Sequence, residues 1–414
     1  MRMRRPTARN AEGGLPVIAF STIAMTMTAF GQTSGVSVFV EPVSRDLGLA
    51  RAEISAVYSL ATLVAALALP WMGRQVDLRG VRRMTMVLAS AFGAVVSAMA
   101  LASSMVWLGL GFVGLRMLGQ GALSLAAKTA VAIAFDRHLG RAVAITGVFS
   151  AIGLSVVPFL LAALIEATDW HVAWAVGGVS IWLVVIPAAR WLMPPDESLR
   201  ATRRRPTLDD DPWTRRQVIR TPIFWLVTLT SASVSLTLTG FAFHQIAILG
   251  DVGLPPAAAA ANYLPQTVAV ILVLAVVAPL SQRMAGRWLM AVAMLFLATG
   301  IAAVAFLDGP VMPFVYAAGL GGALGATQAL DGTLYPRYFG IHAIAAIRGV
   351  ASTVGVAGAA AGPIFVGLMR DLTGDFASGA LALLVLPIGV TVACLIVKEP
   401  DAASRASATS GTTR

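Results

Sequence analysis

Charged side chains are scarce in this chain of 414 residues: Asp, Glu, Lys and Arg together account for 12% of it, whereas hydrophobic residues account for 57%. Soluble domains carry about 25% charged residues, so a soluble protein of this length could not cover its surface with so few. A protein that crosses a bilayer many times needs fewer charges, because lipid covers most of its surface. The composition therefore excludes a soluble globular protein and predicts a polytopic one that is embedded in the lipid bilayer.

Residues that carry much of enzyme chemistry are also few. Cys394 is the only cysteine, which rules out an intrachain disulfide. Neither of the two lysines, Lys128 and Lys398, ends the glycine pattern of a phosphate-binding loop. The four histidines are too scattered for the His-Glu-x-x-His zinc motif, and no Gly-x-Ser-x-Gly elbow occurs. We therefore expect no enzyme, no cofactor and no metal site, which leaves transport driven by a gradient.

Long apolar runs, in contrast, recur along the whole chain. A run of about 20 apolar residues is long enough to cross the hydrocarbon core as a helix. The sequence accordingly predicts an all-α membrane protein with twelve transmembrane helices. The expected spans are 16–40, 53–73, 84–103, 105–127, 145–165, 172–193, 221–247, 257–281, 288–307, 312–334, 349–369 and 377–397.

The basic residues are distributed unevenly between the predicted loops. With twelve spans both termini lie on one side, and that side collects nearly all of the arginines, whereas the opposite loops carry only Arg45, Arg51 and Arg370. Cytoplasmic loops hold the excess of Lys and Arg, so we expect both termini in the cytoplasm and the protein in the inner membrane. The net charge of +10 then reports topology and does not indicate a nucleic-acid partner.

The polar segment 194–220 divides the chain into an N-terminal six-helix half, 1–193, and a C-terminal six-helix half, 221–398. It is rich in turn-forming and charged residues and is typical of a linker, and the small, polar tail 399–414 is expected to be disordered. The halves resemble distant copies, the arrangement of transporters with a binding site near the bilayer midplane. The matching residues, each displaced by 205 positions, are Gly35, Gly48 and Tyr58 in the first half and Gly240, Gly253 and Tyr263 in the second.

A charged segment at 73–83 separates the second and third spans, and four arginines require it to lie in water as a loop. Its Gly-x-x-x-Asp-x-x-Gly-x-Arg spacing, carried by Gly73, Asp77, Gly80 and Arg82, resembles the loop between helices 2 and 3 of the major facilitator superfamily. The resemblance implies two six-helix halves that work by alternating access, with helices 1, 4, 7 and 10 lining the cavity. It also implies that these four residues belong to the cytoplasmic gate.

Further stretches resemble bacterial members of the monocarboxylate-porter branch of that superfamily, which implies proton-linked movement of a small organic anion. Well-studied porters of this branch carry an Asp/Arg pair in helix 8, whereas 257–281 contains no charge. The stretches are 38–60, 135–142, Phe224-Trp225, Tyr338-Phe339-Gly340 and Gly362-Pro363.

An ionisable residue deep in a membrane is costly and is a functional candidate by default. Arg116 lies about ten residues into the fourth span, near the midplane at about 1.5 Å per residue. Its permanently charged guanidinium suits bidentate binding of a carboxylate, and the alternative is that backbone carbonyls or a distant acid satisfy it.

A second candidate pair is Lys128 and Asp331, near the cytoplasmic ends of the fourth and tenth spans. Asp331 is the acidic residue that lies well inside a span, and we expect it to couple transport to protons, with Lys128 or Arg348 as its partner. An inner-gate ion pair is the alternative.

Polar side chains that can donate directional hydrogen bonds to a substrate complete the candidate set, and bonds between helices are the alternative for each. The residues are Gln32, His244, Gln245, Asn262 and Gln266, of which the resemblance favours Gln32 and His244.

Together these features predict a secondary active transporter for a small, monocarboxylate-like organic anion, proton-coupled and monomeric. The alternatives are a proton-driven efflux antiporter for a hydrophobic drug or metabolite and, more remotely, a non-transporting membrane sensor or scaffold. The segment 278–288, which corresponds to the gate segment, keeps basic residues but has no acid. We therefore expect Asp77 to latch one state by pairing with the other half near Arg348.

Overall fold

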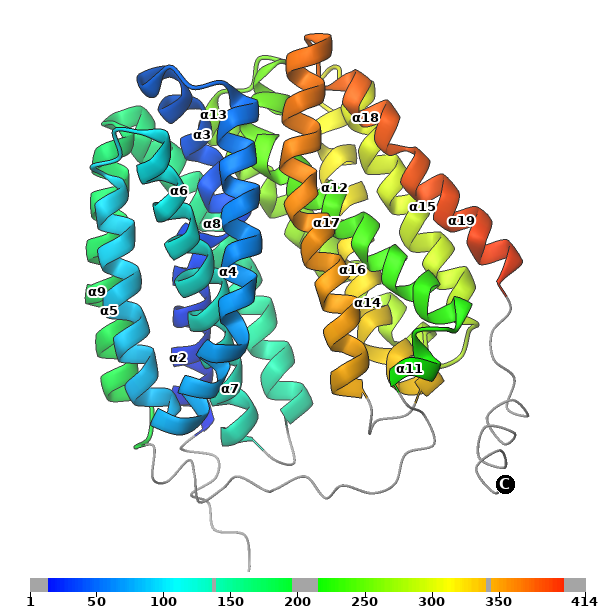
Figure 1. Ribbon diagram of the computed structural model, residues 1–414, viewed down its shortest axis with the longest axis horizontal. Helices are drawn as coiled ribbons and strands as arrows, with labels where there is room; N and C mark the ends of the chain where they lie inside the picture. The colour runs from blue at the N-terminus through cyan, green and yellow to red at the C-terminus, as the bar shows by residue number, and fades with distance from the viewer. Residues whose placement is uncertain (1–13, 136–138, 196–214, 340–343, 398–414) are drawn as a thin grey trace, which may run out of the picture. The chain divides into compact units, whose positions relative to one another are not determined.

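The computed structural model describes residues 14–135, 139–195, 215–339 and 344–397, and within these ranges every regular element is helical (Figure 1). Eleven helical spans within the described residues are long and apolar enough to cross a membrane. The remaining predicted span, 312–334, is covered by the 28-residue helix α16, which is less apolar because it contains five glycines together with Gln328 and Asp331. The prediction of an all-α membrane protein is confirmed.

The chain forms two compact units. The first contains Met1–Ala50 and Leu60–Arg205, and the second contains Arg51–Ser59 and Pro206–Arg414. The boundary falls inside the predicted linker, of which residues 196–214 lie outside the described ranges, as does the predicted tail. The first nine residues of helix α4 thus pack with the second unit, although the rest of that helix belongs to the first.

Helices of the first unit pack through small residues. Gly93 on α5 lies under the ring of Trp182 on α9, where a Cβ atom would come within 2.3 Å of the indole nitrogen, and that nitrogen donates to the Ser90 carbonyl at 3.0 Å. Close approach of this kind is how membrane helices associate without a hydrophobic driving force. The elements are α2 (Gly14–Met27), η1 (Thr28–Gly31), α3 (Thr33–Leu47), α4 (Arg51–Arg79), α5 (Val81–Met99), α6 (Met105–Gly114), η2 (Leu115–Leu123), α7 (Ser124–Ala134), α8 (Leu139–Ala167) and α9 (Trp170–Leu192).

The second unit shows the same principle where α12 meets α17. A Cβ atom on Gly362 would lie 2.1 Å from the Leu236 carbonyl oxygen, and one on Gly240 would lie 2.9 Å from the Gly362 carbonyl oxygen. Glycine at both positions lets the two backbones touch. The elements are α11 (Arg215–Val218), α12 (Pro222–Gly250), α13 (Pro256–Ala261), α14 (Tyr263–Leu280), α15 (Gly286–Ala305), α16 (Met312–Phe339), α17 (Ile344–Thr373), α18 (Ala377–Leu383) and α19 (Val385–Ile396).

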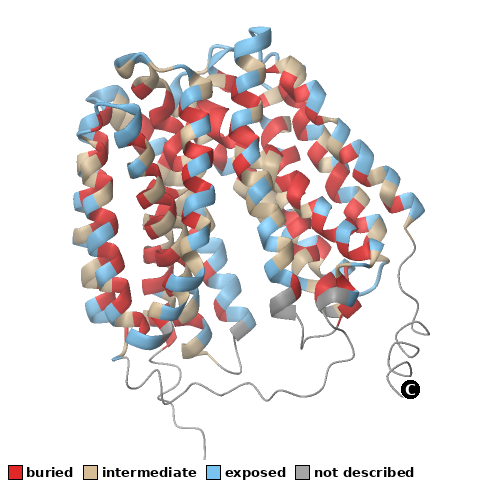
Figure 2. Ribbon diagram, in the orientation of Figure 1, coloured by how far each residue is buried: buried red, intermediate tan, exposed pale blue. Residues whose placement is uncertain are grey.

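Exposed positions along the helices carry many large apolar side chains, and Figure 2 shows exposed and buried residues alternating around them. Leu67 and Trp191, for example, are 83% and 80% exposed. Apolar surface of this extent would be a liability in water and is the expected surface toward lipid.

The prediction of a loop across 73–83 is wrong. Helix α4 continues to Arg79 and α5 begins at Val81, so the break consists of Gly80 alone, whose φ of 96° favours glycine. The arginines do require water, but a helix that leaves the hydrocarbon keeps its internal hydrogen bonds. Polarity of the side chains therefore did not imply irregular backbone.

The two turns after α3 and α12 share one geometry. Gly48 and Gly253 both adopt left-handed conformations, with φ of 64° and 85°. The next residue in each turn donates its N–H to the carbonyl five positions earlier, Leu49 to Ser44 at 3.1 Å and Leu254 to Leu249 at 3.2 Å. This is the six-to-one hydrogen bond of a glycine-terminated helix. The two turns, which lie 205 residues apart in the sequence, thus also form the same hydrogen bond.

Candidate functional site

The first predicted span is not one helix. It runs from Gly14 to Leu47 but is interrupted at Gln32, whose extended backbone, with φ −84° and ψ 154°, separates the 3-10 turn η1 from α3. The Gln32 side chain does not cap α3; its amide instead donates to Oγ1 of Thr28 at 3.3 Å. The interruption exposes helix-terminal backbone groups in the middle of a span, where water is scarce.

Arg116 lies against this interruption. It occupies η2, a nine-residue π-helical segment between α6 and α7, and π segments are frequently found at functional sites. The side chain is buried, with the residue 6% exposed. Its Nη1 donates to the Gly31 carbonyl oxygen at 3.3 Å and to Oγ1 of Thr33 at 3.5 Å. The guanidinium thus spans the break, at the carbonyl end of η1, which attracts a cation, and at the first residue of α3.

Of the candidates named from the sequence, Gln32 and Arg116 are therefore brought to one place. The alternative for Arg116, a guanidinium bound to backbone carbonyls, is also present there, because Gly31 supplies such a carbonyl. The sequence signal for the break is the run Gly31-Gln32-Thr33-Ser34-Gly35, in which glycine and the short polar residues are weak helix formers. That signal lay inside an otherwise apolar stretch and was missed.

His244 lies within helix packing of the second unit. The residue is 1% exposed, and its Nε2 lies 3.1 Å from the Pro363 carbonyl oxygen and 3.3 Å from Oγ of Ser55. A carbonyl oxygen can only accept, and the Ser55 hydroxyl donates to the Arg51 carbonyl at 2.7 Å. Nε2 therefore carries the proton in this arrangement. These contacts join α12 to α17 and to the start of α4. They are hydrogen bonds between helices, which was the alternative to substrate contact for His244.

The amides on α12 and near α14 are also engaged between helices. Gln245 donates to the Ala259 carbonyl at 2.9 Å and accepts from the Tyr316 hydroxyl at 3.2 Å, and Asn262 donates to the Pro313 carbonyl at 3.0 Å. Gln266 is buried on α14. These contacts match the alternative of hydrogen bonds between helices.

Asp331 belongs to a polar cluster in the second unit. The Ser231 hydroxyl on α12 donates to its Oδ1 at 2.7 Å. The Arg348 guanidinium on α17 donates to the main-chain carbonyl of Asp331 at 3.0 Å. One turn further along α16, the hydroxyls of Tyr335 and Thr228 lie 3.1 Å apart. Arg348 thus contacts the main-chain oxygen of Asp331 and not its carboxylate.

Ser231, Thr228 and Tyr335 were not identified from the sequence. The spacing of three residues between Thr228 and Ser231 and of four between Asp331 and Tyr335 puts each pair on one helix face, which was the available signal. Lys128, the other proposed partner, lies on α7 of the first unit with an exposed side chain.

The predicted gate residues lie around the α4–α5 junction, apart from Arg348. Gly73 and Asp77 are on α4, and the side chain of Asp77 is outside the described part of the structure. Gly80 makes the break, and the guanidinium of Arg82 donates to the main-chain carbonyl of Arg190 near the end of α9. A cation at a helix C-terminus is stabilising, so Arg82 ties α5 to the end of α9.

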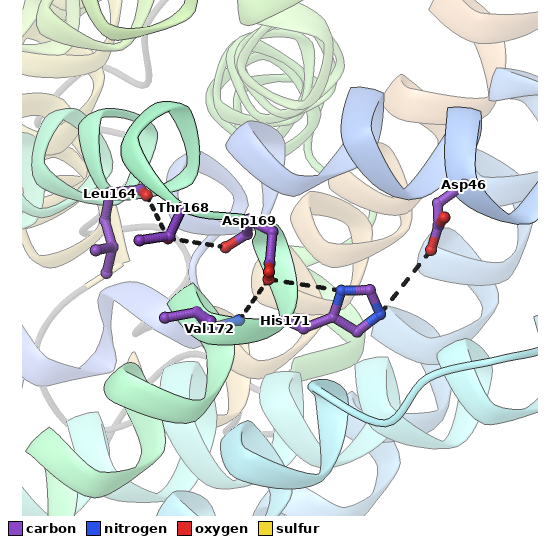
Figure 3. A network of polar contacts seen from close by, with 6 residues as sticks. All are labelled: Asp46, Leu164, Thr168, Asp169, His171 and Val172. Carbon is purple, nitrogen blue, oxygen red and sulfur yellow. Dashed lines mark hydrogen bonds and ion pairs between the residues drawn. The ribbon is translucent and has the colours of Figure 1, made fainter.

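A polar network surrounds His171 at the start of α9 (Figure 3). Asp169 caps this helix by accepting from the Val172 N–H at 2.8 Å. The imidazole of His171 lies between two carboxylates, with Nδ1 3.6 Å from Asp169 and Nε2 3.9 Å from Asp46 on α3. Figure 3 shows both carboxylates directed toward the ring. The network joins the ends of α3 and α9.

A second polar group lies where α17 meets α18. Arg370 pairs with Asp251 at 3.4 Å, and its guanidinium lies over the ring of Phe376, 5.0 Å from the centroid. The Ser378 N–H donates to Asp375 at 2.7 Å. This hydrogen bond, assisted by the charge of Arg370, holds the pKa of the Asp375 carboxyl below its ordinary value.

A multi-pass helical protein with a first helix broken at midspan and a buried cation at the break has the architecture of a secondary transporter. The sequence model of the Major Facilitator Superfamily matches residues 22–363. The chain belongs to this superfamily, and it is a transporter and not an enzyme.

Solved structures support the same fold. Two similar ones are both described as a bacterial homolog to the human lysosomal transporter Spinster, in an inward-facing and occupied and an inward-facing and unoccupied conformation. Their TM-scores are 0.67 and 0.66, and each has 17% sequence identity over 98% of both chains. At this identity the likeness concerns the fold. No curated protein matches the chain.

Proposed function

We propose that this protein is a secondary active transporter that moves a small, monocarboxylate-like organic anion by alternating access and couples this movement to protons. The observation that carries the proposal is the position of Arg116, a permanent cation buried at the break of the first helix. The resemblance of several framework stretches to the monocarboxylate-porter branch agrees with an anionic substrate.

The present hydrogen bonds of the Arg116 guanidinium are weaker than those it would form with a substrate carboxylate. Its Nη1 reaches two neutral oxygens at 3.3 and 3.5 Å, which are long for hydrogen bonds. A carboxylate would offer charge-assisted bonds of about 2.7–2.9 Å, roughly twice as strong and with two acceptors for the guanidinium fork. The N-terminal N–H groups of α3 begin at Thr33 beside the guanidinium and add a positive dipole end. Gln32, which lies between Gly31 and Thr33 in the chain, is proposed to contact the same ligand.

Proton coupling is assigned to Asp331. The span 257–281 has no charged residue, so the second half cannot carry its coupling acid there. Asp331 is held by a serine hydroxyl, a group that can donate to a carboxylate and accept from a carboxylic acid. The contact with Ser231 therefore accommodates both protonation states without a change of partner. His244 and Gln266 are retained as secondary candidates for substrate contact in the second half.

The proposed placement follows the distribution of arginine. A monomer in the inner membrane with both termini in the cytoplasm puts the arginine-rich loops on the cytoplasmic side. The proposal includes small-molecule substrate, protons and lipid as partners, and no nucleic acid.

The proposal is tested with purified protein in lipid nanodiscs, followed by proteoliposomes. We expect lactate, butyrate or benzoate to raise the melting temperature and radiolabelled forms to accumulate when the liposome interior is alkaline. Stabilisation by hydrophobic cations alone, with proton-driven movement of those cations, would instead identify the efflux antiporter and overturn the anion assignment.

A further inference from the structure

The interruption of the first helix touches the π segment backbone to backbone. A Cβ atom built on Gly31 would lie 2.4 Å from the Leu115 carbonyl oxygen and 3.0 Å from the Gln120 amide nitrogen. Both are main-chain atoms, which cannot rotate away as the end of a flexible side chain can. Any side chain at position 31 therefore has to displace the π segment or the broken helix itself.

Displacement of the Leu115 carbonyl oxygen would also move the backbone of Arg116. The carbonyl of Leu115 belongs to the peptide bond whose nitrogen is that of Arg116, so a shift of this oxygen moves the Arg116 backbone directly. On the other side, the Gly31 carbonyl accepts from Nη1 of the same arginine at 3.3 Å. Gly31 thus contacts both the backbone and the head group of Arg116, which makes the glycine part of the arginine's binding geometry.

We propose that Gly31 is a positioning residue that, with the hydroxyl of Thr33, holds the Arg116 guanidinium where an anionic substrate meets it. The inference rests on the proposed function for the role of Arg116, but it adds a requirement for backbone contact that a buried arginine alone does not imply. A misplacement of about 1 Å in a binding group is enough to cost about 100-fold in function. A single Cβ atom at position 31 would therefore be enough to misplace the Arg116 guanidinium, which explains the glycine at this position.

Gly31→Ala is the direct test, and Gly147→Ala on α8 is its matched control. Gly147 lies in a membrane helix of the same unit, and a Cβ atom there would meet nothing within 4 Å. Thr33→Val is the second variant, because it removes the hydroxyl that lies 3.5 Å from Nη1 while adding no backbone overlap. It keeps the proposal testable if Gly31→Ala does not fold.

The first measurement needs no substrate. Full-length protein in nanodiscs is treated with phenylglyoxal, an arginine-specific reagent, and the modification rate at Arg116 is compared by mass spectrometry with that at exposed Arg283. We expect Gly31→Ala to raise the Arg116 rate at least about fivefold through local opening and Thr33→Val to raise it about twofold through loss of one hydrogen bond. Gly147→Ala should leave it unchanged. A folded Gly31→Ala protein, or failing that Thr33→Val, with an unaltered Arg116 rate would overturn the inference.

The second measurement separates this inference from the proposed function. We expect Gly31→Ala to raise the KM for lactate about tenfold with a smaller change in kcat, and to add little when combined with Arg116→Lys, because both changes act on one contact. Independent, multiplying effects would show that Gly31 acts elsewhere and would overturn the inference. If Arg116→Gln binds lactate as the native protein does, the proposed function fails, whereas the phenylglyoxal rates still decide whether Gly31 positions Arg116.

Discussion

The hydroxyl of Ser231 lies 2.7 Å from Oδ1 of Asp331 and joins α12 to α16 through a hydrogen bond. A carboxyl group inside a span is costly unless its oxygens are hydrogen-bonded. Here the donor is neutral, while Arg348 is engaged with the main-chain carbonyl of the same residue. The acid is therefore held in place by contacts that do not require it to stay ionised, which suits a group that gains and loses a proton in each cycle.

Asp331→Asn is predicted to abolish accumulation without abolishing exchange. Asparagine keeps the size of the side chain and an oxygen that accepts from Ser231, but it cannot carry a proton across the cycle. In proteoliposomes with a pH gradient, the accumulation ratio for lactate should fall to about 1, while counterflow persists. Asp251→Asn, at an exposed acid that pairs with Arg370, is the control and should accumulate normally. Gradient-driven accumulation by the Asp331 variant would refute the coupling role.

Arg116→Gln is predicted to lose anion binding with little loss of fold. Removing one partner of a buried, charged hydrogen-bonded pair costs about 2–5 kcal/mol, or about 30-fold or more in affinity. The affinity of Arg116→Lys should lie between those of the native protein and Arg116→Gln, because lysine keeps the charge but not the planar fork. Calorimetric titration with lactate measures all three proteins. Arg283→Gln, at an exposed arginine, serves as control, and equal affinities across the set would contradict the substrate role of Arg116.

The sequence alone predicted the all-helical membrane class and the apolar spans, because hydrocarbon thickness and the cost of charge act on each segment separately. It did not predict the break at Gln32, because an apolar run of sufficient length is compatible with one helix or two. The extended backbone of Gln32 separates η1 from α3, and this conformation depends on packing that an apolar run does not encode.

Hydrogen bonds between helices likewise could not be predicted from the sequence. The sequence around Asp331 does not predict Ser231 as its hydrogen-bond donor, since the two residues lie 100 positions apart. His244 is a similar case: its contact with the Pro363 carbonyl depends on how closely α12 and α17 approach, which the glycines of those helices permit. A histidine in a span can face a cavity or a neighbouring helix, and only packing decides between them.

Gly253→Ala is predicted to destabilise the second unit, because its φ of 85° is unfavourable for a residue with a side chain. The left-handed conformation costs a side-chain-bearing residue about 1–2 kcal/mol. Gly250→Ala is the matched control three residues earlier: it lies in α12, where a Cβ atom meets nothing within 4 Å, and alanine in a helix gains up to about 1 kcal/mol. Thermal unfolding in one detergent should therefore rank Gly250→Ala at or above the native protein and Gly253→Ala below it. The opposite order would contradict the turn geometry.

Asp169→Ala is predicted to loosen the start of α9. The carboxylate accepts from the Val172 N–H at 2.8 Å, and loss of such a cap costs about 1 kcal/mol. Asp169→Asn keeps an acceptor in the same position and should retain most of the stability. Hydrogen exchange of the amides at 170–173, measured by mass spectrometry, should rise for the alanine variant and stay near the native rate for asparagine. Equal protection in both variants would show that the cap contributes nothing.

Asp77→Asn is predicted to slow turnover without changing which substrate is selected. Asp77 lies on α4 three residues before the break at Gly80, and the corresponding segment 278–288 contains no acid, so this charge has no counterpart in the second half. An acid present on one side of a pseudo-symmetric gate biases one state over another, and each tenfold change in that bias corresponds to about 1.4 kcal/mol. Substrate selection, in contrast, is assigned to Arg116, which lies on a different element.

The measurement is kcat and KM for lactate, butyrate and benzoate in proteoliposomes. We expect kcat to fall for all three by about the same factor, up to about fivefold for a change of about 1 kcal/mol in the balance between states, while the ratios between substrates stay constant. Gly147→Ala on α8 is the control outside the predicted gate, because a Cβ atom there meets nothing within 4 Å. Altered ratios between the substrates would place Asp77 in selection, and an unchanged kcat would remove it from the gate. A uniform decrease separates the timing of the cycle from recognition of the anion, as expected if the charge at position 77 acts on the balance between states.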